Sequence, residues 1–352
     1  MNWNPDDDPA MNPYPWLRPL LFALPPEAAH RLSLNGLELA WRAGLLRPRP
    51  VAAPVDCLGL TFPNAVGLAA GLDKNGDHVN ALGALGFGFV EVGTVTPRPQ
   101  PGNPAPRLFR LPEAEALINR FGFNNKGVDH LVRQLEGRRY TGVVGVNIGK
   151  NADTPAEEAV ADYRHGLERV HPVADYITVN ISSPNTRGLR DLQGAEPLRR
   201  LLGELRERAT ALDRGKRRVP LLVKIAPDLD HAGIATVAEV VRETGIDGVI
   251  ATNTTIERDA TRHLHHGEET GGLSGRPVAA LARDALQLLV AELDGAAPVI
   301  AAGGIFSGED AEARMAAGAA LVQIYTGLIY RGPALIGEIA QALAARSEAA
   351  RA

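Results

Sequence analysis

The chain has 352 residues, 45% of them hydrophobic and 22% charged, and its formal net charge is -4. This composition describes a globular protein with a large core, and the slightly acidic balance gives no general reason to expect a nucleic-acid partner. The single cysteine, Cys57, excludes an internal disulfide, no Cys/His spacing indicates a metal site, and no apolar run reaches the ~20 residues of a membrane-spanning helix. No positively charged start precedes an apolar segment, so we expect no cleaved signal peptide.

The first 46 residues are expected to form a disordered start followed by two helices. Residues 1–13 are rich in Asp, Asn and Pro, which is typical of disorder. Within residues 14–46, one apolar helical pattern covers 14–24. A second pattern begins after Pro25, with Pro26 at the helix start, and ends near Gly44, positions that suit proline and glycine.

Two interpretations of residues 14–46 remain open. Five Arg and two Glu in residues 14–50 give this region a local charge of +3, and all three tryptophans lie within the first 41 residues. The helices could form a hairpin that packs on the main domain. Alternatively, they could lie on a bilayer through an apolar face.

From residue 55 onward, short apolar runs rich in β-branched residues alternate with helical patterns. Near-continuous apolar runs suit parallel strands buried on both faces, and their alternation with helices indicates βαβ units. Eight such units favour a closed (β/α)8 TIM barrel, an α/β fold, over an open doubly wound sheet. We therefore expect a barrel over residues 47–352 behind an N-terminal two-helix extension, with extra local structure after the second run. The eight predicted strands cover 64–70, 88–94, 142–148, 175–181, 220–226, 247–253, 298–304 and 320–326, and the clearest helices between them cover 155–170, 196–210 and 278–293.

Polar residues that are mostly uncharged follow the predicted strands. A barrel of this kind carries its chemistry at the carboxyl ends of its strands, and a merely solvated end would show more Asp, Glu and Arg. These positions therefore predict a pocket of hydrogen-bonding groups for a large planar ligand. They are Gly71 to Lys74, Gly93-Thr94, Asn147, Asn180, Lys224, Thr252 to Thr254, Gly303-Gly304 and Tyr325-Thr326.

The last two strand ends suit a phosphate. Gly303-Gly304 and Tyr325-Thr326 follow strands seven and eight, where barrels commonly bind phosphate through backbone N–H groups. A double glycine is also a common tight turn, so the prediction depends on the two loops being neighbours.

Lysine is rare, since it makes up only five of the 37 basic residues. Lys224 follows the fifth strand, where an unpaired ammonium would be costly to bury. It could pair with Asp228, act as a Schiff-base nucleophile, or stabilise charge on a cofactor. Lys74 has the same ambiguity and suits a carboxylate ligand.

The stretch VNISSPNTRGL, residues 179–189, raises the question of whether it is a turn or a catalytic loop. Its Asn, Ser and Pro residues favour a turn for local backbone reasons. However, this stretch resembles the dihydroorotate dehydrogenase family. So do AAGLDKNG, INRFGFNN, GVNIGKN, LVKIAPDL, ATNTT, GGLSG and AAGGI, in the same order over nearly the whole chain beyond residue 14.

The resemblance implies an enzyme that oxidises dihydroorotate to orotate in pyrimidine biosynthesis, with FMN as cofactor. It implies Ser183 as the catalytic base, with Thr186 and Phe123 in a proton relay. The implied substrate contacts are Lys74, Asn119, Arg120, Phe121, Gly122, Phe123, Asn180, Asn185, Asn253 and Thr254. The implied FMN contacts are Ala70, Gly71, Leu72, Asp73, Lys74, Thr94, Asn147, Asn180, Lys224, Thr252, Gly275, Gly304, Tyr325 and Thr326.

A serine in the 180–186 loop resembles the membrane-associated, quinone-reducing class, whereas the soluble class uses a cysteine base and Cys57 lies elsewhere. The resemblance then makes residues 14–46 a quinone-tunnel segment, with His30, Arg110 and Tyr325 near the quinone path. It implies peripheral attachment to the cytoplasmic side of the cell inner membrane. A monomer is our working expectation. The sequence does not set the quinone, the depth of insertion, the oligomeric state, or whether Met1 or Met11 is the start.

Three alternatives remain. A soluble FMN-dependent pyrimidine oxidoreductase with a different electron acceptor is the nearest. A Schiff-base aldolase would use Lys224 and would be colourless. A non-enzymatic membrane adaptor would leave the polar strand ends unexplained.

Overall fold

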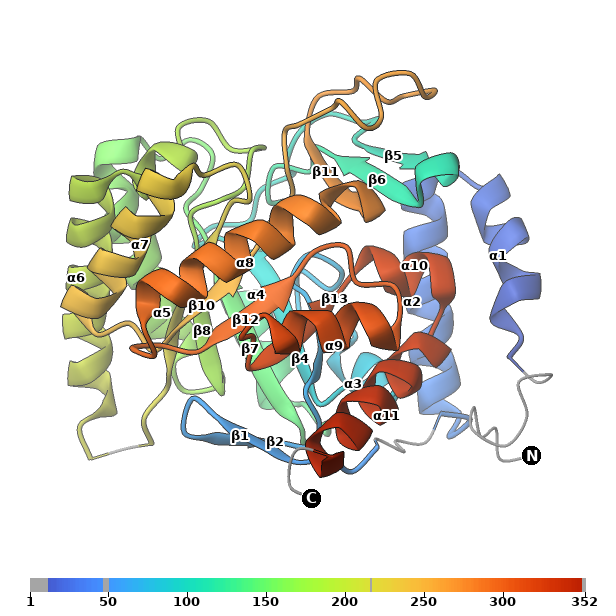
Figure 1. Cartoon of the computed structure of the whole chain (residues 1–352), viewed down its shortest axis with the longest axis horizontal. Helices are drawn as coiled ribbons and strands as arrows, with labels where there is room; N and C mark the ends of the chain where they lie inside the picture. The colour runs from blue at the N-terminus through green and yellow to red at the C-terminus, as the bar shows by residue number, and fades with distance from the viewer. Residues whose placement is uncertain (1–11, 47–50, 216, 350–352) are drawn as a thin grey trace.

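The computed structural model describes residues 12–46, 51–215 and 217–349. Eight parallel strands close into a barrel in the order β10-β12-β13-β3-β4-β7-β8-β9, surrounded by helices (Figure 1). All eight predicted strands are confirmed, with ends that differ by up to two residues from the predicted ones. The barrel strands are β3 (Val66–Leu68), β4 (Phe89–Val95), β7 (Val143–Ile148), β8 (Tyr176–Asn180), β9 (Leu221–Ile225), β10 (Gly248–Ala251), β12 (Val299–Ala302) and β13 (Leu321–Ile324).

The helices confirm the βαβ pattern read from the sequence. Around the barrel lie α3 (Val79–Gly83), α4 (Val128–Glu136), α5 (Ala159–Val170), α6 (Ala195–Asp213), α7 (His231–Thr244), α8 (Ala279–Leu293), α9 (Gly308–Ala316), α10 (Thr326–Arg331) and α11 (Ala334–Ala349). Short 3₁₀ turns lie at Pro112–Ala114, Ala156–Glu158, Arg190–Gln193 and Arg276–Val278.

Two small sheets lie outside the barrel. The hairpin β1 (Val55–Cys57) and β2 (Leu60–Phe62) precedes β3. The predicted extra structure after the second barrel strand is β5 (Leu108–Leu111) and β6 (Ala116–Asn119), which pair with β11 (Gly272–Gly275) in a three-stranded sheet. This sheet stands beside the N-terminal helices in Figure 1.

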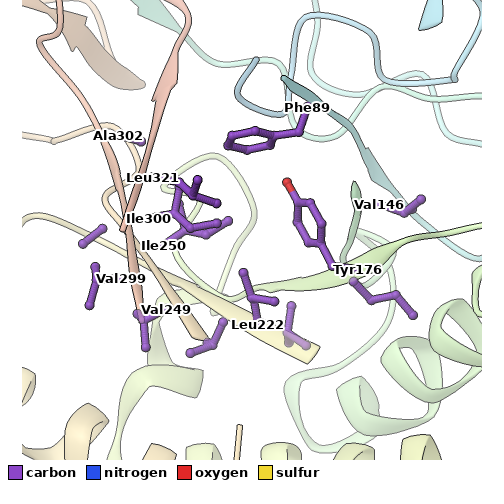
Figure 2. Close-up of a cluster of buried hydrophobic side chains, with 14 of the residues drawn as sticks. Phe89, Val146, Tyr176, Leu222, Val249, Ile250, Val299, Ile300, Ala302 and Leu321 are labelled. Atoms are coloured by element: carbon purple, nitrogen blue, oxygen red, sulfur yellow. The ribbon is translucent and has the colours of Figure 1, made fainter. Parts of the chain in front are cut away.

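The barrel interior is filled by aromatic and branched side chains. Figure 2 shows the rings of Phe89 and Tyr176 inside this cluster, with their centroids 6.4 Å apart. A Cβ at Gly145 would come within 2.1 Å of the Tyr176 ring, so glycine at this position makes room for the ring. Each fully buried aromatic side chain stabilises the fold by about 2 kcal/mol relative to an exposed one.

The two predicted N-terminal helices are present as α1 (Tyr14–Ala23) and α2 (Pro26–Arg42). α1 has no buried residue, and Trp16 and Leu20 on it are 80% and 68% exposed. Polar contacts attach it instead, including one from Arg18 to the Tyr330 carbonyl at 2.9 Å. Among the helices in the described residues, none is long and apolar enough to cross a membrane. The expected disorder of residues 1–13 lies almost wholly outside the described part of the chain.

Candidate active site

The main cavity opens at the carboxyl ends of the barrel strands and encloses about 1030 Å³ of empty space, open solvent at its mouth included. Most of the residues predicted from the sequence meet there. Those lining it are Ala70, Gly71, Lys74, Thr94, Asn119, Phe121, Gly122, Phe123, Asn180, Ser183, Asn185, Lys224, Thr252, Asn253, Thr254, Gly275, Gly304, Tyr325 and Thr326.

Five of the residues predicted at the substrate, the cofactor or the proton relay lie elsewhere, and the quinone-path residues are described below. Leu72 and Asp73 face a second cavity under α2. Asn147 lies behind the wall of the main cavity, where it accepts a hydrogen bond from Thr94 Oγ1 at 2.6 Å. The guanidinium of Arg120 forms an ion pair with Glu269 at 2.6 Å, and Thr186 faces a third cavity. The strand-end rule locates a loop, but it does not say which way each side chain points.

Lys224 is buried in the cavity wall without a carboxylate partner. Its suggested pairing with Asp228 is wrong, because Asp228 forms an ion pair with Arg190 at 2.9 Å and accepts a hydrogen bond from Thr255. Within the described residues, no hydrogen bond or ion pair reaches the Lys224 ammonium. Burial lowers the pKa of Lys224, and the negative charge of Glu91 opposes that shift. An ammonium in this position is available to a ligand.

Lys74 is a second, partly buried cation at the same mouth. Its Nζ donates to the Gly71 carbonyl at 2.8 Å and lies 4.1 Å from the centroid of the Phe121 ring. Burial, helped by the nearby positive charge of Arg107, lowers the pKa of Lys74 to about 8. It is therefore a cation at neutral pH that can bind an anion in the cavity.

The predicted phosphate loops lie side by side, because β12 and β13 are neighbours in the barrel. Gly303 and Gly304 have φ values of +116° and +71°, and a Cβ at Gly304 would come within 2.4 Å of Ala279. Only glycine fits this close approach. Neither N–H group donates a hydrogen bond to another described residue, so both can bind an anionic ligand. Thr326 Oγ1 donates to Ser274 Oγ at 2.9 Å on the same wall.

Three asparagines are joined in one hydrogen-bonded row. Asn180 Nδ2 donates to Asn147 Oδ1 at 3.2 Å, and Asn253 Nδ2 donates to Asn180 Oδ1 at 3.4 Å. They come from β7, β8 and the end of β10. Rotation of any one amide is limited by the others, so this wall is organised before a ligand binds.

The 179–189 stretch is a turn that faces the cavity. Ser183 Oγ accepts the N–H of Asn185 at 3.3 Å, which leaves its own hydrogen free. Arg190 holds the loop by donating to the Ser182 carbonyl at 3.1 Å and to the Thr254 carbonyl at 3.0 Å. The turn and the catalytic interpretation are thus compatible.

Two groups beside Ser183 are unusual. Thr186 Oγ1 is buried and has no hydrogen-bond partner among the residues that the structure describes. Phe123 has φ +54°, a backbone conformation that is uncommon for a bulky residue and is found where function constrains the chain.

The three residues predicted on a quinone path are separated. Tyr325 lines the main cavity, and His30 lines the second cavity, which shares Lys74 and Phe121 with the main one. Arg110 donates to the Phe22 and Leu24 carbonyls at 2.8 and 2.9 Å and so holds the end of α1. Burial, with the nearby positive charge of Lys74, lowers the pKa of His30 to about 4, so it is neutral at pH 7.

Sequence reasoning missed some wall residues. Ser274 and Gln323 line the main cavity. Ser274 lies inside the GGLSG stretch, which was quoted only for its resemblance. Glu91 lies below the cavity and is fully buried. An acid inside an otherwise apolar predicted strand was the signal for it.

The chain is similar to proteins of one family. A family model described as dihydroorotate dehydrogenase matches residues 52–346. A protein of Marinobacter nauticus named dihydroorotate dehydrogenase (quinone) is 56% identical over 334 residues, 94% of this chain and 98% of its own length. One of Thiobacillus denitrificans with the same name is 57% identical, over 94% of this chain and 99% of its own length.

Solved structures give the same result. DHODH of Eimeria tenella in complex with ferulenol has a TM-score of 0.83 at 40% identity, covering 89% of this chain and 90% of that one. Its ligand-free form has a TM-score of 0.81 at 42% identity, covering 89% and 93%. A closed barrel with an amide-lined mouth defines the class of protein, a (β/α)8 barrel with a ligand site at its carboxyl end. The chain belongs to the dihydroorotate dehydrogenase family.

Proposed function

We propose that this chain oxidises dihydroorotate to orotate with FMN as cofactor and a membrane quinone as electron acceptor. The observation that carries the proposal is the main cavity, where two lysines, Ser183 and amides from separate loops meet. The family and the names of its relatives support the reaction and the acceptor.

The cavity suits a planar pyrimidine that bears a carboxylate. Lys74 supplies the cation for the carboxylate. Asn119, Asn180, Asn185 and Asn253 supply complementary donors and acceptors for the ring amides. A site of this kind rejects analogues that leave its polar groups unpaired.

Ser183 removes the proton from C5 of dihydroorotate. A serine needs help to act as a base, and Thr186 Oγ1, three residues further on, is buried without a partner, as a group that passes a proton through a water would be. Phe123, in the wall of the main cavity, shields this route from bulk solvent.

Residues on the opposite wall fit FMN. The unpaired N–H groups of Gly303 and Gly304, beside Thr326, suit its phosphate. The unpaired ammonium of Lys224 suits the negative charge that the ring system gains on reduction. The chemistry that FMN supplies when bound is hydride acceptance from C6 of dihydroorotate and electron transfer to the quinone.

The quinone reaches this site beside α1 and α2, near His30, Arg110 and Tyr325. The exposed apolar side chains of α1 and α2 rest on the cytoplasmic face of the cell inner membrane, and the protein is a peripheral monomer there. Support comes from the exposure of Trp16 and Leu20, which a membrane surface would cover.

An absorbance spectrum followed by anaerobic addition of dihydroorotate tests the function. We expect a bound flavin that dihydroorotate bleaches and that a quinone, but not fumarate or NAD, restores. A flavin that stays oxidised would reject the substrate. A colourless protein that borohydride traps with a carbonyl substrate would favour the aldolase alternative.

A further inference from the structure

A buried carboxylate lies under the floor of the main cavity. Glu91, on β4, is fully buried in the barrel. Three donors point at it: Asn147 Nδ2, the Tyr176 hydroxyl and Gln323 Nε2, each at 2.8 Å. A carboxylate accepts hydrogen bonds and does not donate them, so this arrangement suits the ionised form.

Glu91 also determines how the asparagine row is oriented. Because Asn147 Nδ2 turns down to Glu91, its Oδ1 must turn up, where it accepts from Thr94 Oγ1 at 2.6 Å and Asn180 Nδ2 at 3.2 Å. Asn180 Oδ1 then faces Asn253 Nδ2. Every N–H group that joins the three asparagines points towards Glu91. The negative charge of Glu91 therefore orients the amides as far as Asn253, at the substrate end of the wall.

Lys224 lies on β9 directly opposite Asn180, a member of the asparagine row. Within the described residues, the Glu91 carboxylate is the charged group that opposes the lowering of the Lys224 pKa by burial, and Asp228 is held by Arg190. Two opposite charges that share a dry barrel interior stabilise one another, and removing one leaves the other costly.

Resting on the proposed function, we propose that Glu91 is a positioning residue that acts through Lys224 and Asn147. Its carboxylate keeps Lys224 as an ammonium and fixes the direction of the asparagine row, and in this way it sets the reduction potential of the bound flavin.

Other titratable groups around Lys224 must be separated from this effect. Burial raises the pKa of Tyr325 to about 12 and that of Tyr176 well above its usual value, so neither is charged near neutral pH. Lys74 does titrate near pH 8. Its contribution is common to every variant below and cancels when they are compared.

The flavin reduction potential of the purified holoenzyme is measured from about pH 6 to 9 in wild type, Glu91→Gln and the double variant Glu91→Gln/Lys224→Met. Without Glu91, burial lowers the pKa of Lys224 with no opposing charge, so we expect Lys224 to lose its proton as pH rises. We expect the Glu91→Gln potential to lie above wild type at low pH and to approach it as pH rises. The double variant has no lysine at position 224, so its potential should not show this pH-dependent change. A difference that is constant with pH would overturn the proposal.

Tyr176→Phe is the matched control, since it removes one hydrogen bond to Glu91 and keeps both charges. Its potential should run parallel to that of wild type. A slope like that of Glu91→Gln would mean that hydrogen bonding, and not the charge, governs the effect, and would overturn the pairing. If Glu91→Gln does not fold, Lys224→Met serves instead. With Lys224 gone the Glu91 charge is unopposed, so the potential should lie below that of wild type, and a potential equal to that of wild type would contradict the pairing.

Heat denaturation of the same purified proteins needs no flavin signal. A lysine with a lowered pKa in the folded state makes stability rise with pH, because the unfolded chain binds more protons. Tm should therefore rise more steeply in Glu91→Gln than in the double variant, and equal slopes would contradict the proposal. Failure of dihydroorotate to bleach the wild-type flavin rejects the proposed function instead and leaves this comparison intact.

Discussion

The two ends of the barrel differ in whether their charged groups have bound partners. At the amino end, Asp175 and Asp247 directly precede β8 and β10. Asp175 binds Arg138 at 2.9 Å and Arg217 at 3.2 Å. Asp247 binds Arg206 and Arg218, and its Oδ2 accepts the Leu221 N–H at 2.7 Å. Each carboxylate thus joins neighbouring strands and helices through partners that satisfy it.

At the carboxyl end the cations have no such partners. Lys224 is buried and Lys74 is partly buried. Within the described residues, neither has a bound carboxylate, and Gly303 and Gly304 leave N–H groups unpaired. Buried polar groups without partners cost stability. The amino end therefore stabilises the fold, and the carboxyl end gives up stability to keep its groups free for ligands.

Removing the Ser183 hydroxyl should abolish most of the catalysis at the carboxyl end without affecting the fold. This is the largest effect that we expect. Ser183→Ala should lower kcat by about 10²–10⁴-fold, the range for losing general-base catalysis, while flavin content and Tm stay near wild type. Steady-state turnover and the flavin spectrum check this. Ser182→Ala is the control, because Ser182 Oγ accepts from Asn253 at 3.0 Å and Ser182 does not line the main cavity; we expect about a tenfold loss. Equal losses in the two variants would reject Ser183 as the base.

Asp247→Asn, at the amino end, should lower the stability of the fold without lowering turnover. It leaves two arginines without their carboxylate, and breaking such a partly buried group costs about 3 kcal/mol. Urea denaturation should show this loss in the free energy of unfolding, while kcat per folded molecule is unchanged. Asp153→Asn breaks the exposed Arg98 pair and should cost less than about 1 kcal/mol. A loss of kcat in Asp247→Asn would mean that the two ends are coupled.

The fold was largely predictable because buried parallel strands are apolar runs of similar length. All eight runs became barrel strands. The pairing of β6 with β11 could not be read, since Asn119 and Gly272 are partners far apart in the sequence. Register between distant segments depends on packing, which a local pattern does not contain.

The site was predictable as a set of loops and less so as a set of contacts. Asn147 was expected at the cofactor; it does not line the main cavity, and it accepts a hydrogen bond from Thr94 Oγ1. The scarcity of lysine was informative for Lys74 and Lys224 but not for Lys126. The side chain of Lys126 forms an ion pair with Asp77 and is more than half exposed. A residue type at a strand end indicates chemistry, whereas its direction depends on neighbours in space.

Substrate binding should show the pH dependence of a free cation. The pKa of Lys74 is lowered to about 8 by burial, so it is charged below pH 8 and loses its proton above it. The Kd for orotate should therefore rise with pH, by up to about tenfold per unit above pH 8. Titration followed by flavin absorbance checks this. Lys74→Met should bind weakly at every pH, and an unchanged wild-type Kd between pH 7 and 9.5 would contradict the assignment.

Substitutions of exposed apolar residues on the N-terminal helices should have the smallest effect on stability. Their main effect should be on membrane binding. Trp16 and Leu20 are 80% and 68% exposed, so Trp16→Ser/Leu20→Ser should change the free energy of unfolding by about 0.5 kcal/mol at most. If these side chains enter a bilayer, each contributes about 2 kcal/mol of binding, and sedimentation with vesicles that contain anionic phospholipid should fall at least tenfold. Leu288→Ser, on α8 and 37% exposed, should leave vesicle binding unchanged. If all these proteins bind vesicles equally, α1 is a packed hairpin helix and not a membrane contact, because exposure alone does not distinguish the two.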